Sequence, residues 1–282
     1  MSGNSIADSS AVSVPRMLSQ HQAAITMLDE LLTNRPEETP FDWLDLACGR
    51  GQILSHLKDA LPEDAKRARI RYFGFDVDNS YVREADARAK SLNFAGADIT
   101  IGQLDHFHQI VPPDQKYSFI TFTNVVHELP PRLFGSLLLE LILRMKPTGT
   151  LYIFDMESLA DPELGAITWD NNEVRRLLTF IYKELGAAQG PPGIPRWPYS
   201  SCVAWSFRLQ REKLDVGPDA FAQKMPELKT KIEAFIIALF KERFERTKEA
   251  LEDLTNLGGA ETGEEQTRKM KLLYDFWSLS RL

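Results

Sequence analysis

The chain has 282 residues, of which 43% are hydrophobic and 26% charged, and its formal net charge at pH 7 is −7. This length and apolar content allow one sizeable core with additional helices outside it. The negative charge disfavours a general attraction to nucleic-acid phosphates, and every apolar run is far shorter than the ~20 residues that a membrane-spanning helix needs.

The N-terminal residues and the cysteine content indicate the compartment. Residues 1–16 lack a basic region followed by an apolar run, which is the pattern of a secretory signal. The two cysteines, Cys48 and Cys202, are too few and too far apart for a disulfide framework or a tetrahedral zinc site. We therefore expect a cytoplasmic protein without a structural metal.

The predicted elements begin with a helix. Apolar residues recur at helical spacing from Val14 to Leu32, and Asn34, Arg35 and Pro36 end the pattern. We expect residues 1–36 to form a tail and an amphipathic helix.

Apolar strands and amphipathic helices then alternate. The predicted strands cover 41–48, 70–78, 98–104, 117–126 and 149–157, and the predicted helices cover 52–60, 80–92 and 132–145. Nearly continuous apolar strands joined by crossover helices indicate a parallel sheet with helices on both faces. The predicted fold class is therefore α/β, with a doubly wound, mostly parallel sheet within residues 37–212.

The rest of this domain is less regular. We expect a helix over 169–186 and a last strand over 203–212, whose alternating polar residues suit a sheet edge. The segment 186–201 is rich in glycine and proline, which predicts a long loop on the ligand side.

Residues 213–282 are predicted to form a C-terminal helical extension. Gly217 and Pro218 break the chain, Pro226 permits a new helix start, and a helix with one apolar face follows until about Gly258. Thr262 and Glu265 form a capping-box pattern before a final helix. The apolar face needs a partner, which is this domain, a second copy of the chain or another protein.

The stretch LDLACGRGQ, residues 44–52, lies where the first strand turns into the first helix. Gly49 and Gly51 permit a positive φ and a close approach of a ligand to the backbone, and the helix start offers free N–H groups. This motif resembles the first motif of the class I S-adenosylmethionine-dependent methyltransferases. The resemblance to this family extends over roughly residues 40–211. The resemblance implies a Rossmann-like fold, S-adenosyl-L-methionine as cofactor, and Asp45 as the acid that orients its amino-acid end. Ala47 replaces the first glycine of the turn.

The resemblance also implies the rest of the cofactor site. Asp76 ends the second strand, followed by Val77, and its carboxylate suits the two ribose hydroxyls. After the third strand, Gln103 and Leu104 are the expected adenine contacts, with Asp105 as the competing acid.

The fourth strand resembles the segment whose end lies beside the transferring methyl group. Asn124 stands at its end and His127 three residues later, while Ser118 occupies a position where relatives often carry an acid. Methyl transfer needs alignment and, for a weak nucleophile, a base, and His127 is the best candidate base. A hydrogen-bonding role within the core is the alternative for His127. Asp155, which ends the fifth strand, either faces the acceptor or caps the next turn.

Three aromatic residues are candidates for the walls of an acceptor pocket, or alternatively cover the core: Trp169, Trp197 and Tyr199. The acceptor itself is a small molecule, a protein side chain or a nucleic acid. The chain lacks the Asn/Asp-Pro-Pro-Tyr/Phe tetrapeptide and the Pro-Cys pair typical of base- and amide-methylating enzymes, which favours a small molecule.

Other readings of these motifs are weaker. A nicotinamide-binding fold would carry a third glycine at position 54, where Leu54 stands. His106 and His108 suggest a metal site only superficially, because no third ligand is evident. The remaining alternative is a non-catalytic methyltransferase-like scaffold whose C-terminal helices bind a protein partner, or a homo-oligomer formed through them.

Overall fold

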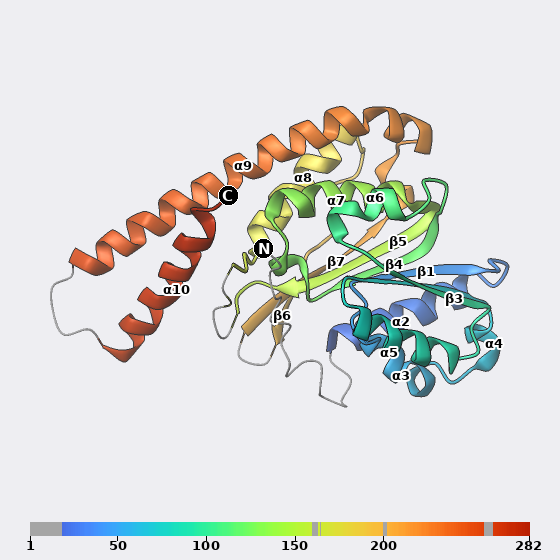
Figure 1. Ribbon diagram of the computed structural model, residues 1–282. Helices are drawn as coiled ribbons and strands as arrows, with labels where there is room; N and C mark the ends of the chain where they lie inside the picture. Colours follow the sequence, from blue (N-terminus) through green and yellow to red (C-terminus); the bar gives the residue numbers. More distant parts are fainter. Residues whose placement is uncertain (1–18, 160–162, 164, 200–201, 257–261) are drawn as a thin grey trace. The chain divides into compact units, whose positions relative to one another are not determined.

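In a computed structural model of the protein, drawn in Figure 1, the described residues are 19–159, 163, 165–199, 202–256 and 262–282. Strands within these residues form one sheet in the order β3-β2-β1-β4-β5-β7-β6, with parallel pairing among β1 to β4 and antiparallel pairing of β6 with β7. The predicted doubly wound α/β class is confirmed. The predicted helical residues 14–18 lie outside the described residues.

The chain divides into two compact units. Of the described residues, those within 19–123 and 144–152 form the first unit, and those within 124–143 and 153–282 form the second. Strand β5 (Met145–Met156) passes from the first unit into the second.

The first unit contains the strands that follow the predicted pattern. They are β1 (Phe41–Leu46), β2 (Ile70–Asp76), β3 (Gly96–Ile101) and β4 (Tyr117–Thr123). Its helices are α2 (Ser19–Asn34), α3 (Gln52–Ala60), α4 (Asp64–Arg67), α5 (Asn79–Lys90), η1 (Leu104–His106) and α6 (Phe107–Ile110). Because β1 to β4 run parallel, their carboxyl ends meet at one edge, where open α/β sheets bind ligands.

Local sequence explains where the helices of this unit start. Gly51 adopts the left-handed conformation and is followed at once by α3. Asp78 precedes α5, and its carboxylate accepts hydrogen bonds from the N–H groups of Ser80 and Tyr81 as an N-cap. The helix α3 is the first helix after β1, and α5 is the first after β2, so both helices begin at the edge where the carboxyl ends of these strands lie.

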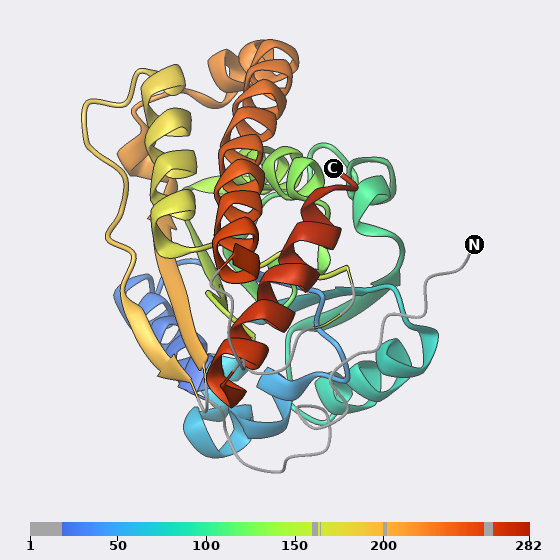
Figure 2. The same ribbon diagram turned by 90° about the vertical axis from the view of Figure 1, so that its left-hand side faces the viewer.

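The second unit is mainly helical. Besides the end of β5, it contains η2 (Val126–Glu128), α7 (Pro131–Leu143), α8 (Asn171–Leu185), β6 (Arg196–Tyr199), β7 (Cys202–Gln210), η3 (Arg211–Leu214), α9 (Pro218–Asn256) and α10 (Gly263–Leu279). The helix α10 folds back along α9, and the two lie side by side in Figure 2. Thr262 and Glu265 form the predicted capping box of α10. None of the described helices is long and apolar enough to span a membrane.

The apolar face of α9 is buried by the chain's own helices α7 and α8. Ile232 and Ile236 on α9 face Gly135 on α7, where an added Cβ atom would lie 2.3 Å from the Ile236 Cδ1 atom. Phe235 on α9 stacks on Phe180 of α8 at 4.5 Å between ring centroids. Of the three partners considered for this face, the structure shows the first, a neighbouring part of the same chain.

Two predictions about the chain after residue 186 are wrong. The predicted long loop contains β6, which pairs with β7 and occupies the end of the sheet, so that β7 is not the edge strand. Pro198 is tolerated in β6 because an edge strand has unpaired N–H positions.

The second correction concerns Pro226, which does not start a new helix but lies inside α9. An interior proline costs about 3 kcal/mol in an isolated helix. Here the residues on one face before and after it are all buried, so a continuous helix buries more apolar surface than a break would. These residues are Phe221, Met225, Leu228 and Ile232.

Candidate functional site

The carboxyl ends of β1, β2 and β3 are joined by backbone hydrogen bonds. The N–H group of Cys48 donates to the carbonyl oxygen of Phe75 at 3.1 Å, and the N–H group of Gly102 donates to that of Asp76 at 3.0 Å. The segments predicted to bind the three parts of the cofactor are thereby held at one edge of the first unit.

The turn after β1 has three residues in the left-handed region. The φ angles of Ala47, Gly49 and Gly51 are 54°, 55° and 75°. Glycine adopts such angles without strain, which explains two of the three positions. The turn brings the N–H group of Gly49 to 2.8 Å from the Oδ2 atom of Asp76. The two motifs of the sequence, 27 residues apart, are thus in direct contact.

Asp76 is a buried carboxylate with backbone donors on both oxygens. Its Oδ1 atom accepts a hydrogen bond from the N–H group of Asp78 at 3.0 Å, in addition to the contact of Oδ2 with Gly49. Burial raises the pKa of Asp76, and the backbone hydrogen bonds oppose that shift. The two oxygens have about four lone pairs between them, so beyond the backbone donors Gly49, Val77 and Asp78 the group still has the capacity to accept a hydroxyl hydrogen bond. A carboxylate acceptor of this kind fits the hydroxyl groups of a ribose.

Asp45 is deeply buried, and both of its carboxylate oxygens accept hydrogen bonds from side chains. Its Oδ1 atom accepts a hydrogen bond from the Thr121 hydroxyl at 2.7 Å, and its Oδ2 atom accepts one from the Tyr72 hydroxyl at 3.0 Å. Burial raises the pKa of Asp45 to about 6, although both hydroxyls oppose that shift. Sequence reasoning missed Thr121 and Tyr72. Each carries a hydroxyl group within an otherwise apolar strand, and that feature could have identified them.

Apolar side chains are exposed beside Asp76. Val77 is 45% exposed and Ile101, at the end of β3, is 49% exposed. Large apolar side chains with this much exposure at a ligand edge suit the flat face of a purine ring. Gln103 and Asp105 are both exposed, so each remains a candidate for the adenine amino group, whereas Leu104 is buried.

Asn124, the first residue of the second unit, directly follows β4. It adopts a left-handed φ of 59°, and its N–H group donates to the carbonyl oxygen of Phe154 at 2.9 Å. Its Oδ1 atom is buried and has no hydrogen-bond partner among the described residues. An unsatisfied buried acceptor is costly, and a bound ammonium or N–H group would satisfy it.

The second unit also brings together His127 and Asp155, which are 28 residues apart. The Nδ1 atom of His127 lies 2.6 Å from the Oδ1 atom of Asp155, and the backbone N–H group of His127 donates to Oδ2 at 2.7 Å. Both side chains are buried. The Oε2 atom of Glu163, which sequence reasoning missed, lies 3.9 Å from Nε2 of His127.

The aromatic residues considered as pocket walls differ in their surroundings. Trp169 is fully buried between Phe134 and Phe240, with ring centroids at 5.3 and 4.7 Å, so it is a core residue. Trp197 is partly exposed on β6 and donates from Nε1 to the Ser206 hydroxyl at 2.8 Å. The side chain of Tyr199 lies outside the described residues.

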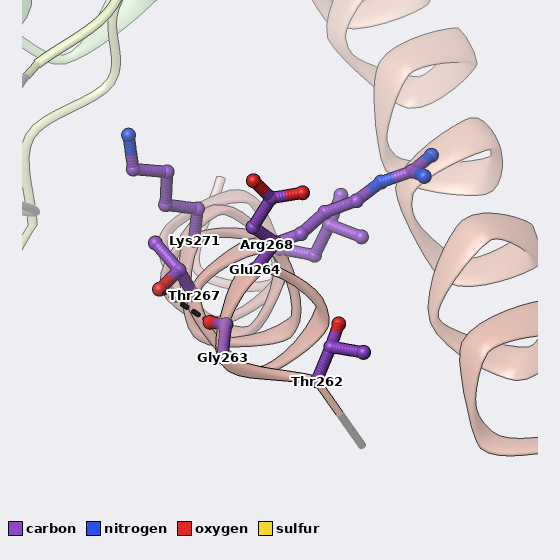
Figure 3. A pocket seen from close by; sticks show the side chains of 7 residues that line it. Thr262, Gly263, Glu264, Thr267, Arg268 and Lys271 are labelled. Atoms are coloured by element: carbon purple, nitrogen blue, oxygen red, sulfur yellow. Dashed lines mark hydrogen bonds between the residues drawn. The ribbon is translucent and has the colours of Figure 1, made fainter. Parts of the chain in front are cut away.

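A hollow of about 910 Å³ lies at the start of α10 (Figure 3). The residues that line it are Thr262, Gly263, Glu264, Thr267, Arg268, Lys271 and Leu272. Arg268 and Lys271 point away from each other in Figure 3, and the capping box already satisfies the start of the helix. None of the predicted site residues lines this hollow. Among the described residues, no group of three or more His, Cys, Asp or Glu side chains could hold a metal ion.

Comparisons with known proteins agree with this geometry. Residues 41–190 match the family described as "Methyltransferase domain". No curated protein sequence matches the chain. The structure of the plantazolicin methyltransferase BpumL in complex with SAH is similar, with a TM-score of 0.52, 16% sequence identity, and coverage of 72% of this chain and 87% of that one. The CurJ carbon methyltransferase gives a TM-score of 0.54 and 12% identity, covering 73% of this chain and 58% of that one.

At these identities the two solved structures indicate the fold, whereas the family match covers more than half of the sequence. The family match and the strand order support the same assignment. The chain belongs to the methyltransferase-domain family and is a class I S-adenosylmethionine-dependent methyltransferase.

Proposed function

We propose that this methyltransferase holds S-adenosylmethionine at the carboxyl edge of its first unit and methylates a small-molecule acceptor. The residues proposed to bind the cofactor are Asp45, Ala47, Gly49, Gly51, Asp76, Val77, Gln103, Leu104 and Asn124. The observation that carries this proposal is the contact between the Asp76 carboxylate and the Gly49 N–H group in the turn before α3.

Each proposed contact follows from the chemistry of the chain. Asp76 accepts hydrogen bonds from the ribose hydroxyls, and the free N–H groups at the start of α3 face the carboxylate of the amino-acid end. Asp45 supplies negative potential toward the ammonium group, and the Oδ1 atom of Asn124 supplies an acceptor. When bound, the cofactor supplies a methyl group on a sulfonium, which is electrophilic.

His127 and Asp155 are the proposed residues on the acceptor side. His127 lies four residues beyond the end of β4, the strand that resembles the segment ending beside the transferring methyl group in this family. One similar BpumL structure contains SAH, and another contains SAH together with a pentazolic desmethylPZN analog. A small molecule is therefore the acceptor class we propose.

The domain organisation, compartment and partners are further parts of the proposal. We place the catalytic domain at residues 37–212, preceded by residues 1–36 and followed by the helical extension 213–282, and the family match over 41–190 supports this core. The low cysteine content supports a cytoplasmic location. Exposed apolar residues on α10 would be available to a protein partner or a second copy: Met270, Leu273 and Trp277.

Calorimetric titration with S-adenosylhomocysteine tests the proposed cofactor site. Asp76→Asn should weaken binding by about 10- to 100-fold, because it removes charge-assisted hydrogen bonds to the ribose. Asp78→Asn is the matched control, since an asparagine still caps α5 and binding should stay within about twofold. Folded wild-type protein that does not bind the ligand would contradict the proposal and favour a non-catalytic scaffold.

A further inference from the structure

Asp155 holds His127 at two points. One carboxylate oxygen contacts the ring at Nδ1 and the other accepts from the backbone N–H group of the same residue. Asp155 Oδ1 also accepts from the N–H group of Met156 at 2.6 Å. The imidazole is thereby fixed in orientation, and Nε2 is the only ring nitrogen left for a ligand.

Among the described residues, the charged groups that act on this ring are all negative. Asp155 faces it from β5, Glu128 from η2, and Glu163 from the segment between β5 and α8. Burial by itself lowers the pKa of His127, but the charge of Asp155, the hydrogen bond to it, and the charges of Glu128 and Glu163 raise it to about 9. The ring is therefore an imidazolium at pH 7, with N–H groups on both nitrogens.

An imidazolium cannot accept a proton, which removes the general-base role suggested by the sequence. A hydroxyl or ammonium acceptor would then lack a base, since its proton must be lost before or during methyl transfer. An acceptor that is already ionised needs no base. Carboxylates are ionised at pH 7, whereas phenols and thiols, with ordinary pKa values of about 10 and 8.5, are mostly not.

We propose that His127, positioned by Asp155, donates a hydrogen bond from Nε2 to an acceptor carboxylate, and that the product is a methyl ester. This inference rests on the proposed function. The Oε2 atom of Glu163 lies 3.9 Å from Nε2, which is beyond hydrogen-bond distance, so a carboxylate of this chain already approaches that nitrogen. His127 is the catalytic residue in this account, and Asp155 is a positioning residue.

The transfer balances without a proton. A lone pair of the acceptor oxygen forms the bond to the methyl carbon while the methyl–sulfur bond breaks, and its electron pair stays on sulfur. The negative charge of the acceptor and the positive charge of the sulfonium disappear together. The imidazolium keeps its proton throughout and orients the attacking oxygen.

The lability of the product tests the acceptor class. The full-length protein is incubated with methyl-labelled S-adenosylmethionine and a cell lysate, and each labelled fraction is then treated with mild base. Methyl esters release volatile labelled methanol, whereas ethers, thioethers and methylamines do not. Volatile label as the main product supports the inference. Label that stays non-volatile overturns the inference but not the methyltransferase function, and no transfer to any fraction counts against both.

The pH profile tests the charge on His127. With the labelled lysate fraction as acceptor, the wild-type rate should be flat from pH 6.5 to 8 and fall as pH rises through about 9, where the imidazolium loses its proton. His127→Gln keeps a hydrogen-bond donor but has no charge. Its methyl-transfer rate should be at least about tenfold lower than that of the wild type and should not fall near pH 9. A wild-type rate that rises with pH through this range would show a general base and overturn the inference.

Two further variants separate positioning from folding. Asp155→Asn should move the fall to lower pH by about 1 to 3 units, because it removes the nearest negative charge, and Glu163→Gln should move it less in the same direction. A purely structural role of Asp155 would lower the rate without moving the profile. His108→Gln, at an exposed residue of α6, is the control and should change neither rate nor profile.

Discussion

Two single residues depart from the family pattern, one in the glycine turn and one in β4. Ala47 stands where relatives have glycine, and it adopts a φ of 54° that an alanine reaches only with strain. Ser118 stands where relatives often carry an acid, and here its hydroxyl donates to the carboxylate of Glu38, which also pairs with Lys146 at 3.0 Å. The missing acid is therefore supplied by another residue in the same unit.

Ala47→Gly should stabilise the protein by up to about 1 kcal/mol, because glycine relieves the left-handed strain and this gain exceeds its larger unfolded-state entropy. Urea unfolding without cofactor measures the change. Ala87→Gly, at an exposed helical position of α5, is the matched control and should destabilise by about 1 kcal/mol. Loss of stability in both variants would contradict the strain assigned to Ala47.

At the scale of elements, α9 is part of the second unit's core. Its apolar side chains pack on α7 and α8, and ion pairs such as Lys229 with Glu140 and Arg176 with Glu242 flank the contact. Helical periodicity predicted this apolar face, since residues three and four apart lie on one side of a helix. The identity of the covering helices was open, because periodicity carries no information about the partner.

Two neighbouring isoleucines test this packing. Ile236 is 1% exposed and faces Gly135, whereas Ile237 is 43% exposed. Ile236→Ala should cost about 2 to 5 kcal/mol through lost burial and a cavity, and Ile237→Ala should stay within about 0.5 kcal/mol. Thermal and urea unfolding measure both. Equal costs would mean that the opposite face of α9 is also covered in solution.

At the scale of the whole molecule, the two C-terminal helices differ in how much they contribute. Along α9, eight residues are buried, whereas only Ser278 and Leu279 are buried on α10. The helix α10 contacts α9 through the stacking of Phe276 on Phe244 and the ion pair of Asp275 with Arg243. We infer that α9 is required for folding and that α10 is an addition to it.

Truncation distinguishes these roles. A chain ending at Val216 should be insoluble or lack a cooperative transition, because it exposes the apolar surfaces of α7 and α8. A chain ending at Asn256 should fold, with an intact S-adenosylhomocysteine affinity and a slightly lower Tm. Solubility, circular dichroism and calorimetry measure these properties. A soluble, cooperative chain ending at Val216 would contradict the assignment of α9 to the core.

The amino-acid sequence by itself determined the alternation of strands and helices, the glycine turn and the acid Asp76, because these depend on local periodicity and backbone freedom. The family also followed from these motifs. Only the tertiary structure decided that Asp155 holds His127 across 28 residues, that Thr121 and Tyr72 surround Asp45, and that α7 and α8 cover α9. Such contacts join residues that are distant in the chain. A local sequence pattern shows that an apolar surface or a buried charge needs a partner, but it does not specify which residues supply that partner.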